Sequence, residues 1–275
     1  MIYSIEMLPH QFAELHKACQ RVQDLLSLQQ LLVFVSHLSH TDYSSVLKAT
    51  ATLIAHGYSV VPHLAVRNLQ PNEAADQILT EMRHMGVRSI LLLGGDKDKP
   101  AHFHSVESFL AATPAITRMK LEQVFFPTFP DGHLHTDETG ALKQLKSKCD
   151  FALQHGLAPR LISQIAIDSE TITQHQIKLS QWGIDAPLSL GCVASLSPGK
   201  MLKTARMIGL DRAFRFASQA NLPRLIMSYD LDKFTAPLLA TENLGGVHFY
   251  PFGNYDGALE RLAGLAQGEH SRAYA

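Results

Sequence analysis

Short apolar segments recur along the whole chain, and amphipathic segments of helical length separate them. Uninterrupted apolar strands between helices of this length are typical of a parallel sheet whose two faces are both buried. Eight such units in 275 residues predict an α/β fold, a single (β/α)8 TIM-type barrel over residues 1–275. The expected strands are Ile2–Met7, Leu31–Ser36, Ser59–Leu64, Ser89–Leu93, Gln123–Phe129, Leu161–Ile167, Pro187–Val193 and Gly246–Phe249.

The segments between these strands carry helical periodicity and helix stop signals such as Gly57, Gly86 and Gly156. An open doubly wound sheet is the rival fold, but it usually has a glycine-rich turn after its first strand, and Glu6–Pro9 has no glycine. The segment 223–243 is long and irregular, and within it Leu225–Tyr229 fits either a strand or a helical turn. The expected helices are Phe12–Leu26, Ser44–His56, Pro71–Met85, Ser105–Ala112, Glu138–His155, Ser169–Trp182, Pro198–Ala220 in two pieces, and Asp256–Ala266.

Charge and cysteine usage narrow the class of protein. The net charge of −1 and the pI near 6.9 favour neither nucleic acid nor an anionic membrane as a partner. No apolar stretch is long enough to span a membrane, and the first residues lack the order of a signal peptide. Cys19, Cys149 and Cys192 form no CxxC pair, which indicates reduced thiols in a cytoplasmic protein.

Polar residues stand where the expected strands end, which is where barrel enzymes place their active sites. Glu6 is the most unusual of them, because a carboxylate in an apolar strand must be desolvated, paired or reactive. The set includes neither a Ser-His-Asp arrangement nor a strand-end lysine. It suits proton transfer and recognition of a planar heterocycle, with redox chemistry left to a cofactor. The residues are Glu6, Ser36, His37, His63, Asp96, Asp131, His133, Gln164, His248 and Tyr250.

Fifteen histidines include two HxH pairs, His102/His104 and His133/His135. On a strand, residues i and i+2 share a face, so either pair could supply two metal ligands. No Asp, Glu or His accompanies them at a recognisable zinc spacing. Solvated or loop-capping histidines are therefore the better interpretation, and we expect no metal site.

Six motifs, in order and at strand ends, resemble those of the methylenetetrahydrofolate reductase family, which folds as a (β/α)8 barrel. Ser4–Pro9 is similar to its Phe-Glu-Phe-Phe-Pro first strand, and Val61–Leu64 to its Pro-His-Leu motif. The remaining matches are Leu92–Asp96 with Leu-Arg-Gly-Asp, Phe129–His133 with Tyr-Pro-Glu-x-His, Leu145–Asp150 and Ile162–Gln164 with Leu-Lys-x-Lys-x-Asp and Ile-Thr-Gln, and Val247–Tyr250 with His-Phe-Tyr.

The resemblance implies roles for single residues. Glu6 is expected to be the general acid that protonates a folate nitrogen as the methylene bridge opens, with a pKa raised by burial. Asp96 is expected to stay ionised and to act in catalysis and pterin binding, together with the substrate-binding residues Gln164 and Tyr250. The resemblance also implies FAD as cofactor and NADH or NADPH as co-substrate. The expected cofactor-binding residues are Ser36, His37, His63, Gly95, His133 and Lys148.

The mismatches with the family pattern lie on the flavin side. Gly94 replaces the arginine before Gly-Asp, and Ala141 stands where the family has an aspartate for the ribityl chain. Phe129 lacks the hydroxyl of the family's tyrosine, and Pro251–Asn254 replaces Thr-Leu-Asn-Arg. Arg67, Lys97, Lys99 and the backbone at Gly94–Gly95 could compensate by meeting an anion.

Two hypotheses follow from the resemblance, beside the remaining alternative of a barrel enzyme with a metal at the HxH pairs. The first is a divergent methylenetetrahydrofolate reductase that interconverts 5,10-methylene- and 5-methyl-tetrahydrofolate. The second is a flavin-free folate-binding protein or methyl-transfer partner that keeps only the pterin site. Both predict a tetrahydrofolate derivative as ligand, no nucleic acid or membrane partner, and a homo-oligomer as one possible assembly.

Overall fold

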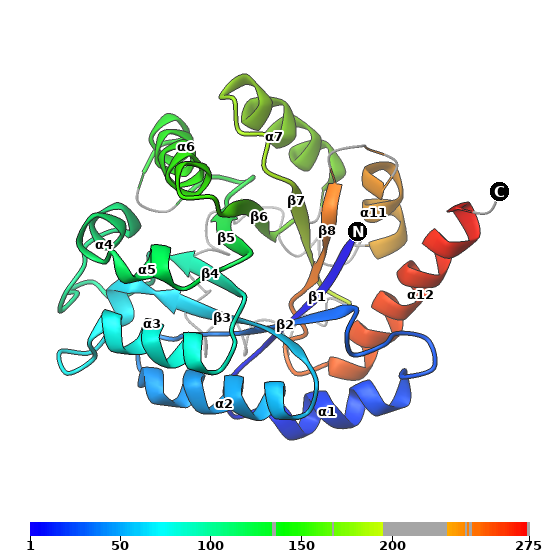
Figure 1. The fold of residues 1–275 in the computed structure, drawn as a ribbon. Helices are drawn as coiled ribbons and strands as arrows, with labels where there is room; N and C mark the ends of the chain where they lie inside the picture. The colour runs from blue at the N-terminus through cyan, green and yellow to red at the C-terminus, as the bar shows by residue number, and fades with distance from the viewer. Residues whose placement is uncertain (134–135, 167, 195–229, 240, 242–243, 274–275) are drawn as a thin grey trace.

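Eight parallel strands close into a barrel in the order β1-β2-β3-β4-β5-β6-β7-β8, with β8 pairing back to β1 (Figure 1). The computed structural model describes residues 1–133, 136–166, 168–194, 230–239, 241 and 244–273. The predicted (β/α)8 fold is confirmed. The strands are β1 Ile2–Met7, β2 Leu31–Val35, β3 Ser59–Ala65, β4 Ser89–Leu93, β5 Gln123–Thr128, β6 Ala158–Ile165, β7 Leu188–Cys192 and β8 Leu244–Phe249.

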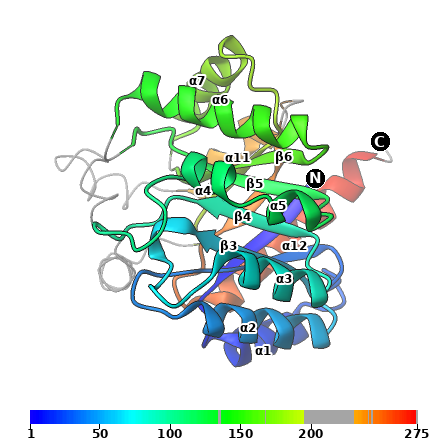
Figure 2. The same cartoon turned by 60° about the vertical axis from the view of Figure 1, so that its left-hand side comes forward.

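Helices surround the strands on the outside of the barrel (Figures 1 and 2). A one-turn 3-10 helix, η1, follows β3 directly at Val66–Asn68. The described helices are α1 Phe12–Arg21, α2 Tyr43–Ala55, α3 Ala75–His84, α4 Val106–Ala112, α5 Ala115–Arg118, α6 Glu138–Gln154, α7 Ser169–Gln181, α11 Leu231–Leu239 and α12 Tyr255–Ala273. None of the helices in the described ranges is both long and apolar enough to cross a membrane.

The apolar residues form two clusters, because side chains on a strand point alternately to its two faces. The larger cluster joins the outer faces of the strands to the helices, including Ile5, Val33 and Leu92. The smaller cluster fills the barrel interior with one residue from each of five strands, namely Phe34, Val61, Leu91, Phe125 and Ile162. This apolar plug forms the floor on which the polar residues near the strand ends rest.

The boundaries differ from the predicted ones where local signals were weak. The first helix ends at Arg21 rather than Leu26, and the following turns still bury Val22 and Leu26. The segment expected to be irregular contains α11, whose start is capped by Asp230: its Oδ1 accepts from the backbone N–H groups of residues 232 and 233. Pro237 inside α11 obscured the helical pattern.

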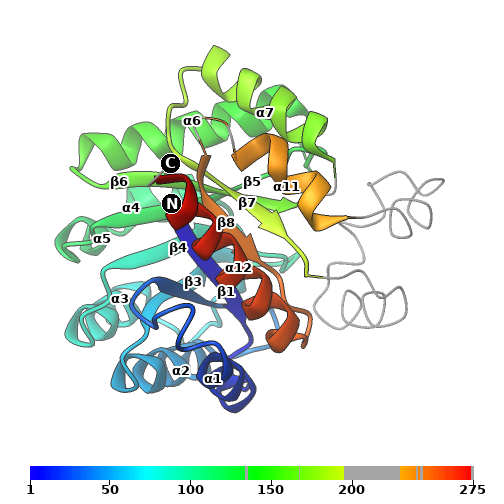
Figure 3. The same ribbon diagram turned by 90° about the vertical axis from the view of Figure 1, so that its right-hand side faces the viewer.

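Helix α12 covers the seam where β8 pairs with β1, and α11 lies beside α7. In Figure 3, α12 runs beside β1 and β8 and packs on α1, while α11 packs against α7. The helices predicted between residues 198 and 220, and the segment Leu225–Tyr229, lie outside the described residues.

Candidate functional site

Four polar side chains face the barrel interior from the neighbouring strands β1 and β8. Ser4 and Glu6 lie two residues apart on β1, as do His248 and Tyr250 at the end of β8, so each pair shares the inner face. The register places Ser4 directly opposite His248. We call these four residues the mouth cluster.

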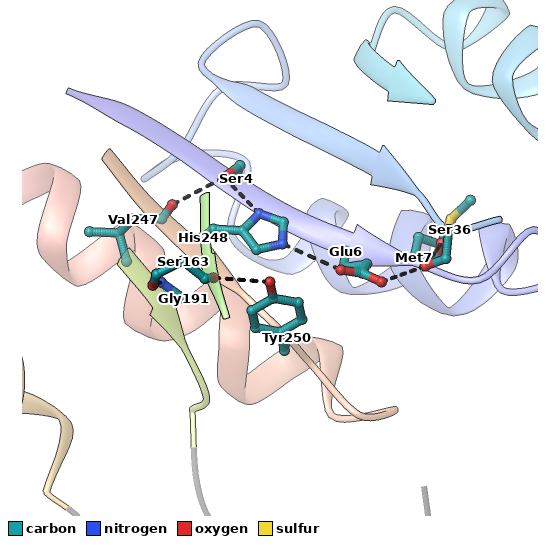
Figure 4. Close-up of polar contacts among 9 residues, drawn as sticks. All are labelled: Ser4, Glu6, Met7, Ser36, Ser163, Gly191, Val247, His248 and Tyr250. Carbon is teal, nitrogen blue, oxygen red and sulfur yellow. Dashed lines mark hydrogen bonds and ion pairs between the residues drawn. The ribbon is translucent and has the colours of Figure 1, made fainter. Parts of the chain in front are cut away.

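Glu6 contacts polar groups from two other strands (Figure 4). The Ser36 hydroxyl, just beyond β2, donates to Glu6 Oε1 at 2.6 Å. His248 Nε2 lies 3.5 Å from Glu6 Oε2. The His248 side chain is 1% exposed and that of Glu6 is 22% exposed, so the histidine is sealed while the carboxylate reaches the mouth of the barrel.

The pKa of Glu6 lies below its ordinary value, whereas burial alone predicted a pKa above it. Burial raises it, but the hydrogen bonds from His248 and Ser36 and the charges of His63 and His248 together lower it to about 2. The prediction of a raised pKa is therefore wrong for the ligand-free protein. The reason is that polar partners surround Glu6, whereas the prediction considered only burial.

The Ser4 hydroxyl determines which ring nitrogen of His248 carries the hydrogen. Ser4 Oγ lies 3.2 Å from the Val247 carbonyl oxygen and 3.0 Å from His248 Nδ1. If the hydroxyl donates to the carbonyl, Nδ1 must donate to Ser4 and so carries the one hydrogen of a neutral ring. A hydrogen between Nε2 and Glu6 is then an additional proton on the pair of His248 and Glu6. If the hydroxyl donates to Nδ1, Nε2 carries the hydrogen of the neutral ring. The orientation of the Ser4 hydroxyl thus determines whether the pair holds a transferable proton.

Tyr250 presents its ring to the mouth, because its hydroxyl is already engaged. The hydroxyl donates to the Ser163 backbone oxygen at 3.2 Å, and the ring meets that of His248 edge to face at 4.7 Å. Burial raises the pKa of Tyr250 well above its ordinary value, so the phenol stays protonated. Tyr250, expected to bind substrate, thus has its hydroxyl engaged within the protein, which leaves its ring as the group for a ligand.

Gln164 lies at an irregularity in the barrel. The pairing of β6 with β7 shifts register between Ile162 and Ile165. Gly191 on β7 fits against this shift, since a Cβ there would come within 2.4 Å of the Ser163 carbonyl oxygen. Bulges next to active sites commonly redirect a side chain, and Gln164 is partly exposed at this position.

A second group of expected residues lies around the ends of β2, β3 and β4. His37 Nδ1 accepts from the Ala65 backbone N–H at 3.3 Å. Burial lowers the pKa values of His37 and His63 to about 4, so both are neutral at pH 7. Nε2 of His63 is buried and has no hydrogen-bond partner among the described residues. Asp96 is exposed and accepts from the Ser39 hydroxyl at 3.1 Å.

The backbone turn at Gly95 is not available to an anion. The N–H groups of Asp96 and Lys97 both donate to the side-chain oxygen of Asn68. Arg67 Nη2 donates to the Lys97 backbone oxygen at 2.7 Å, and Lys97 Nζ to Gln70 Oε1 at 3.0 Å. Of the groups expected to compensate for the missing arginine, Lys97 and Arg67 Nη2 are thus bound within the protein, as are the two N–H groups that follow Gly95.

His133 and Lys148 lie away from the mouth cluster, on a small cavity between the end of β5 and α6. The cavity measures about 50 Å³, which suits a small group rather than a whole ligand. Its lining includes Thr128, His133, Ala141, Lys148 and His175, and we call it the cofactor-side cavity. Burial lowers the pKa of Lys148, which lies near the Glu107 carboxylate. Thr128 Oγ1 and His175 Nε2 are 2.6 Å apart.

The HxH pairs show no metal-binding arrangement in the part of the chain that is described. His102 Nε2 lies 2.8 Å from the Gln70 backbone oxygen, the contact of a loop-capping histidine. Within the described ranges, no three His, Cys, Asp or Glu side chains come together as metal ligands. His135 lies outside these ranges.

Some residues of the site were missed or undervalued in the sequence. Ser4 and Asn68 were not singled out, and His248 was named at a strand end and within a motif but was given no role. The i, i+2 spacing of Ser4 with Glu6 and of His248 with Tyr250 was a usable signal for the mouth cluster. Nothing in the sequence marked Asn68, because its contacts are with loops that follow other strands.

Comparisons with known proteins identify the family of this chain and support its fold. The model of the family described as methylenetetrahydrofolate reductase matches residues 1–228. No curated protein sequence matches the chain. An uncharacterized protein from Clostridium thermocellum that binds two copies of 5-methyl-5,6,7,8-tetrahydrofolic acid is 11% identical over 96% of this chain and 93% of its own, with a TM-score of 0.57.

A second solved structure extends the similarity of fold to a protein with a different function. A GH18 chitinase from Pseudoalteromonas aurantia is 9% identical over 94% of this chain and 99% of its own, with a TM-score of 0.53. At such identities both structures show the barrel fold alone, since this fold supports many unrelated activities.

Proposed function

Because the chain belongs to the methylenetetrahydrofolate reductase family, we propose that it binds a tetrahydrofolate at the barrel mouth and interconverts 5,10-methylene- and 5-methyl-tetrahydrofolate. The observation that carries the proposal is the mouth cluster, in which Glu6 is paired with His248 beneath an open strand end. The Clostridium thermocellum protein, which binds 5-methyl-tetrahydrofolic acid in the same fold, adds support for a folate ligand.

The reaction needs one hydride and one proton. NADH or NADPH supplies the hydride as co-substrate, and it ends on the methylene carbon. The proton ends on folate N10 as the bond between N10 and the methylene carbon breaks, leaving an iminium at N5. Glu6 is the proton donor at N10. A folate above the carboxylate removes water and raises the pKa of Glu6. The additional proton of the pair then moves from Nε2 of doubly protonated His248 to Glu6 and on to N10, which leaves His248 as a neutral ring with its hydrogen on Nδ1.

Other residues of the mouth bind and orient the folate. Tyr250 offers an aromatic face on which a pterin can stack, and its hydroxyl keeps the ring fixed. Asp96 and Gln164 supply acceptor and amide groups suited to the pterin edge. His63 Nε2, buried without a partner among the described residues, is available to a ligand atom.

The residues fit a flavin poorly. The cofactor-side cavity brings His133 and Lys148 together, but Ala141 contributes no polar group there. Lys148 lies near a carboxylate of the protein, and the N–H groups of Asp96 and Lys97 are already bonded to Asn68. FAD, which the resemblance implies, therefore enters no step of the mechanism proposed above.

The poor fit of these residues to a flavin also favours a second function. A folate-binding protein or methyl-transfer partner without redox chemistry needs only the pterin side of the mouth. It predicts binding of 5-methyl-tetrahydrofolate that is weakened by Asp96→Asn, with no oxidation of NADH or NADPH.

The test combines binding and turnover on the purified protein. Calorimetry with 5-methyl-tetrahydrofolate measures the folate site, and the decay of nicotinamide absorbance with 5,10-methylene-tetrahydrofolate measures reduction, with and without added FAD. Binding together with turnover supports the reductase. Binding without turnover supports the second function, and absence of binding contradicts both.

A further inference from the structure

Asn68 is a buried amide that joins the loops after three consecutive strands. It ends η1, which follows β3, and it is 1% exposed. Its Oδ1 accepts from the backbone N–H of Asp96 at 3.1 Å and from that of Lys97 at 3.2 Å, both beyond β4. Its Nδ2 donates to the His37 backbone oxygen beyond β2, also at 3.1 Å. One side chain therefore satisfies three backbone groups.

The turn before Asp96 is shaped to fit Asn68. Gly95 has a φ of +90°, a conformation that side-chain-bearing residues rarely adopt. A Cβ at Gly95 would come 2.5 Å from Asn68 Oδ1, so the amide occupies the space that a side chain would need. The two N–H groups after Gly95 then point inward to Asn68, while the Asp96 carboxylate remains exposed at the mouth.

Neighbouring contacts hold the same loops by other means. The Arg67 backbone N–H donates to the Gly94 oxygen at 2.8 Å, and Lys97 Nζ donates to Gln70 Oε1 at 3.0 Å. These bonds leave the direction of the Asp96 backbone undetermined, because none of them involves residues 95 or 96. Asn68 fixes the direction of this backbone, while the Ser39 hydroxyl donates to the Asp96 carboxylate itself at 3.1 Å.

We propose that Asn68 is a positioning residue that holds the Gly95 turn so that Asp96 is directed at the folate. This inference rests on the proposed function, since it takes Asp96 as a folate-binding carboxylate. It also gives a physical reason for the glycine at position 95, since a Cβ there would collide with the Asn68 amide.

The test is a double-mutant cycle between Asn68→Ala and Asp96→Asn, read as the Kd for 5-methyl-tetrahydrofolate. Asn68→Ala leaves three backbone groups without their partner, and we expect binding to weaken about tenfold or more. In the Asp96→Asn background, the same change should weaken binding less than about threefold, because there is no carboxylate left to position. Equal effects in both backgrounds would overturn the inference.

Further variants separate positioning from general loss of structure. Asn68→Asp keeps the oxygen that accepts from both N–H groups, so we expect tighter binding than in Asn68→Ala, and it substitutes for that variant if Asn68→Ala does not fold. Gly95→Ala should weaken binding as Asn68→Ala does, because its Cβ collides with the amide. Gln70→Ala removes the neighbouring contacts to Lys97 Nζ and to the backbone oxygens of Ser39 and Asn68 but leaves the Asn68 side chain in place, so it should bind within about threefold of the unmutated protein.

The outcomes distinguish this inference from the proposed function. If the unmutated protein fails to bind 5-methyl-tetrahydrofolate, both are wrong. If it binds and Asn68→Ala has no effect, or if Gln70→Ala has the same effect as Asn68→Ala, the folate site stands and the role of Asn68 is refuted.

Discussion

The mouth cluster and the cofactor-side cavity lie in the same barrel but are built differently. In the mouth cluster, Glu6 has a hydroxyl on one side and an imidazole on the other, and the imidazole is itself held by Ser4. In the cofactor-side cavity, Ala141 supplies no carboxylate beside Lys148. The carboxylate near Lys148 is instead that of Glu107. This difference is the reason for proposing proton transfer at the mouth cluster and no flavin chemistry at the cavity.

The largest predicted effect breaks the mouth cluster at its centre. Glu6→Gln keeps the size of the side chain but removes the transferable proton. We expect NADH- or NADPH-linked reduction of 5,10-methylene-tetrahydrofolate to fall roughly 10²–10⁴-fold. The Kd for 5-methyl-tetrahydrofolate, measured by calorimetry, should change by less than about threefold. Equal losses in turnover and binding would assign Glu6 to binding alone.

The next prediction concerns a feature that the two regions share. His63 in the mouth and His175 on the cavity have pKa values of about 4 instead of 6.5, chiefly because both are buried. Between pH 6.5 and 4 the unfolded chain binds more protons than the folded chain, so the free energy of unfolding falls as the pH is lowered through this window. Each histidine accounts for up to about 3 kcal/mol of this loss.

Urea unfolding at several pH values measures that loss. We expect His175→Gln to make the loss of unfolding free energy between pH 6.5 and 4 smaller by about 2–3 kcal/mol. His84→Gln, at an exposed position, is the control and should leave it unchanged. A pH dependence that is identical in all three proteins would contradict the burial-induced shift.

A smaller effect is expected when the imidazole beside Glu6 is removed. His248→Asn eliminates a hydrogen bond and a charge that lower the pKa of Glu6, so this pKa should rise from about 2 toward its ordinary value. We expect kcat to fall roughly tenfold or somewhat more, since Glu6 must then take its proton from water. The alkaline limb of the kcat–pH profile, where the general acid loses its proton, should shift to higher pH. Ser4→Ala should show the same trend more weakly, and an unshifted profile in both variants would separate His248 from proton transfer.

The smallest predicted effect repairs the cofactor-side cavity. Ala141→Asp restores the carboxylate of the family pattern beside Lys148, and we expect the affinity for FAD to rise about threefold to tenfold. Ser147→Asp, on the exposed side of the same helix, adds the same charge outside the cavity and serves as control. Flavin fluorescence titration compares the two. Tight FAD binding by the unmutated protein would remove the contrast between the two regions.

The sequence was sufficient for features that repeat or alternate. The barrel follows from eight apolar segments, and Glu6 was conspicuous because its strand is otherwise apolar. What the sequence lacked was information about contacts between strands distant in the chain. The low pKa of Glu6 depends on Ser36 and His248, and the turn before Asp96 depends on Asn68. Helix α11 was missed for a local reason, since Pro237 interrupts its pattern.

The protonation state of Glu6 is the most direct test of the account. Infrared difference spectroscopy at pH 7 detects the carbonyl stretch of a protonated carboxyl group, and the comparison of the unmutated protein with Glu6→Gln assigns it. The account predicts no such band from Glu6 in the ligand-free protein and its appearance when 5-methyl-tetrahydrofolate binds. A Glu6 band already present without ligand, or none in the folate complex, would contradict it.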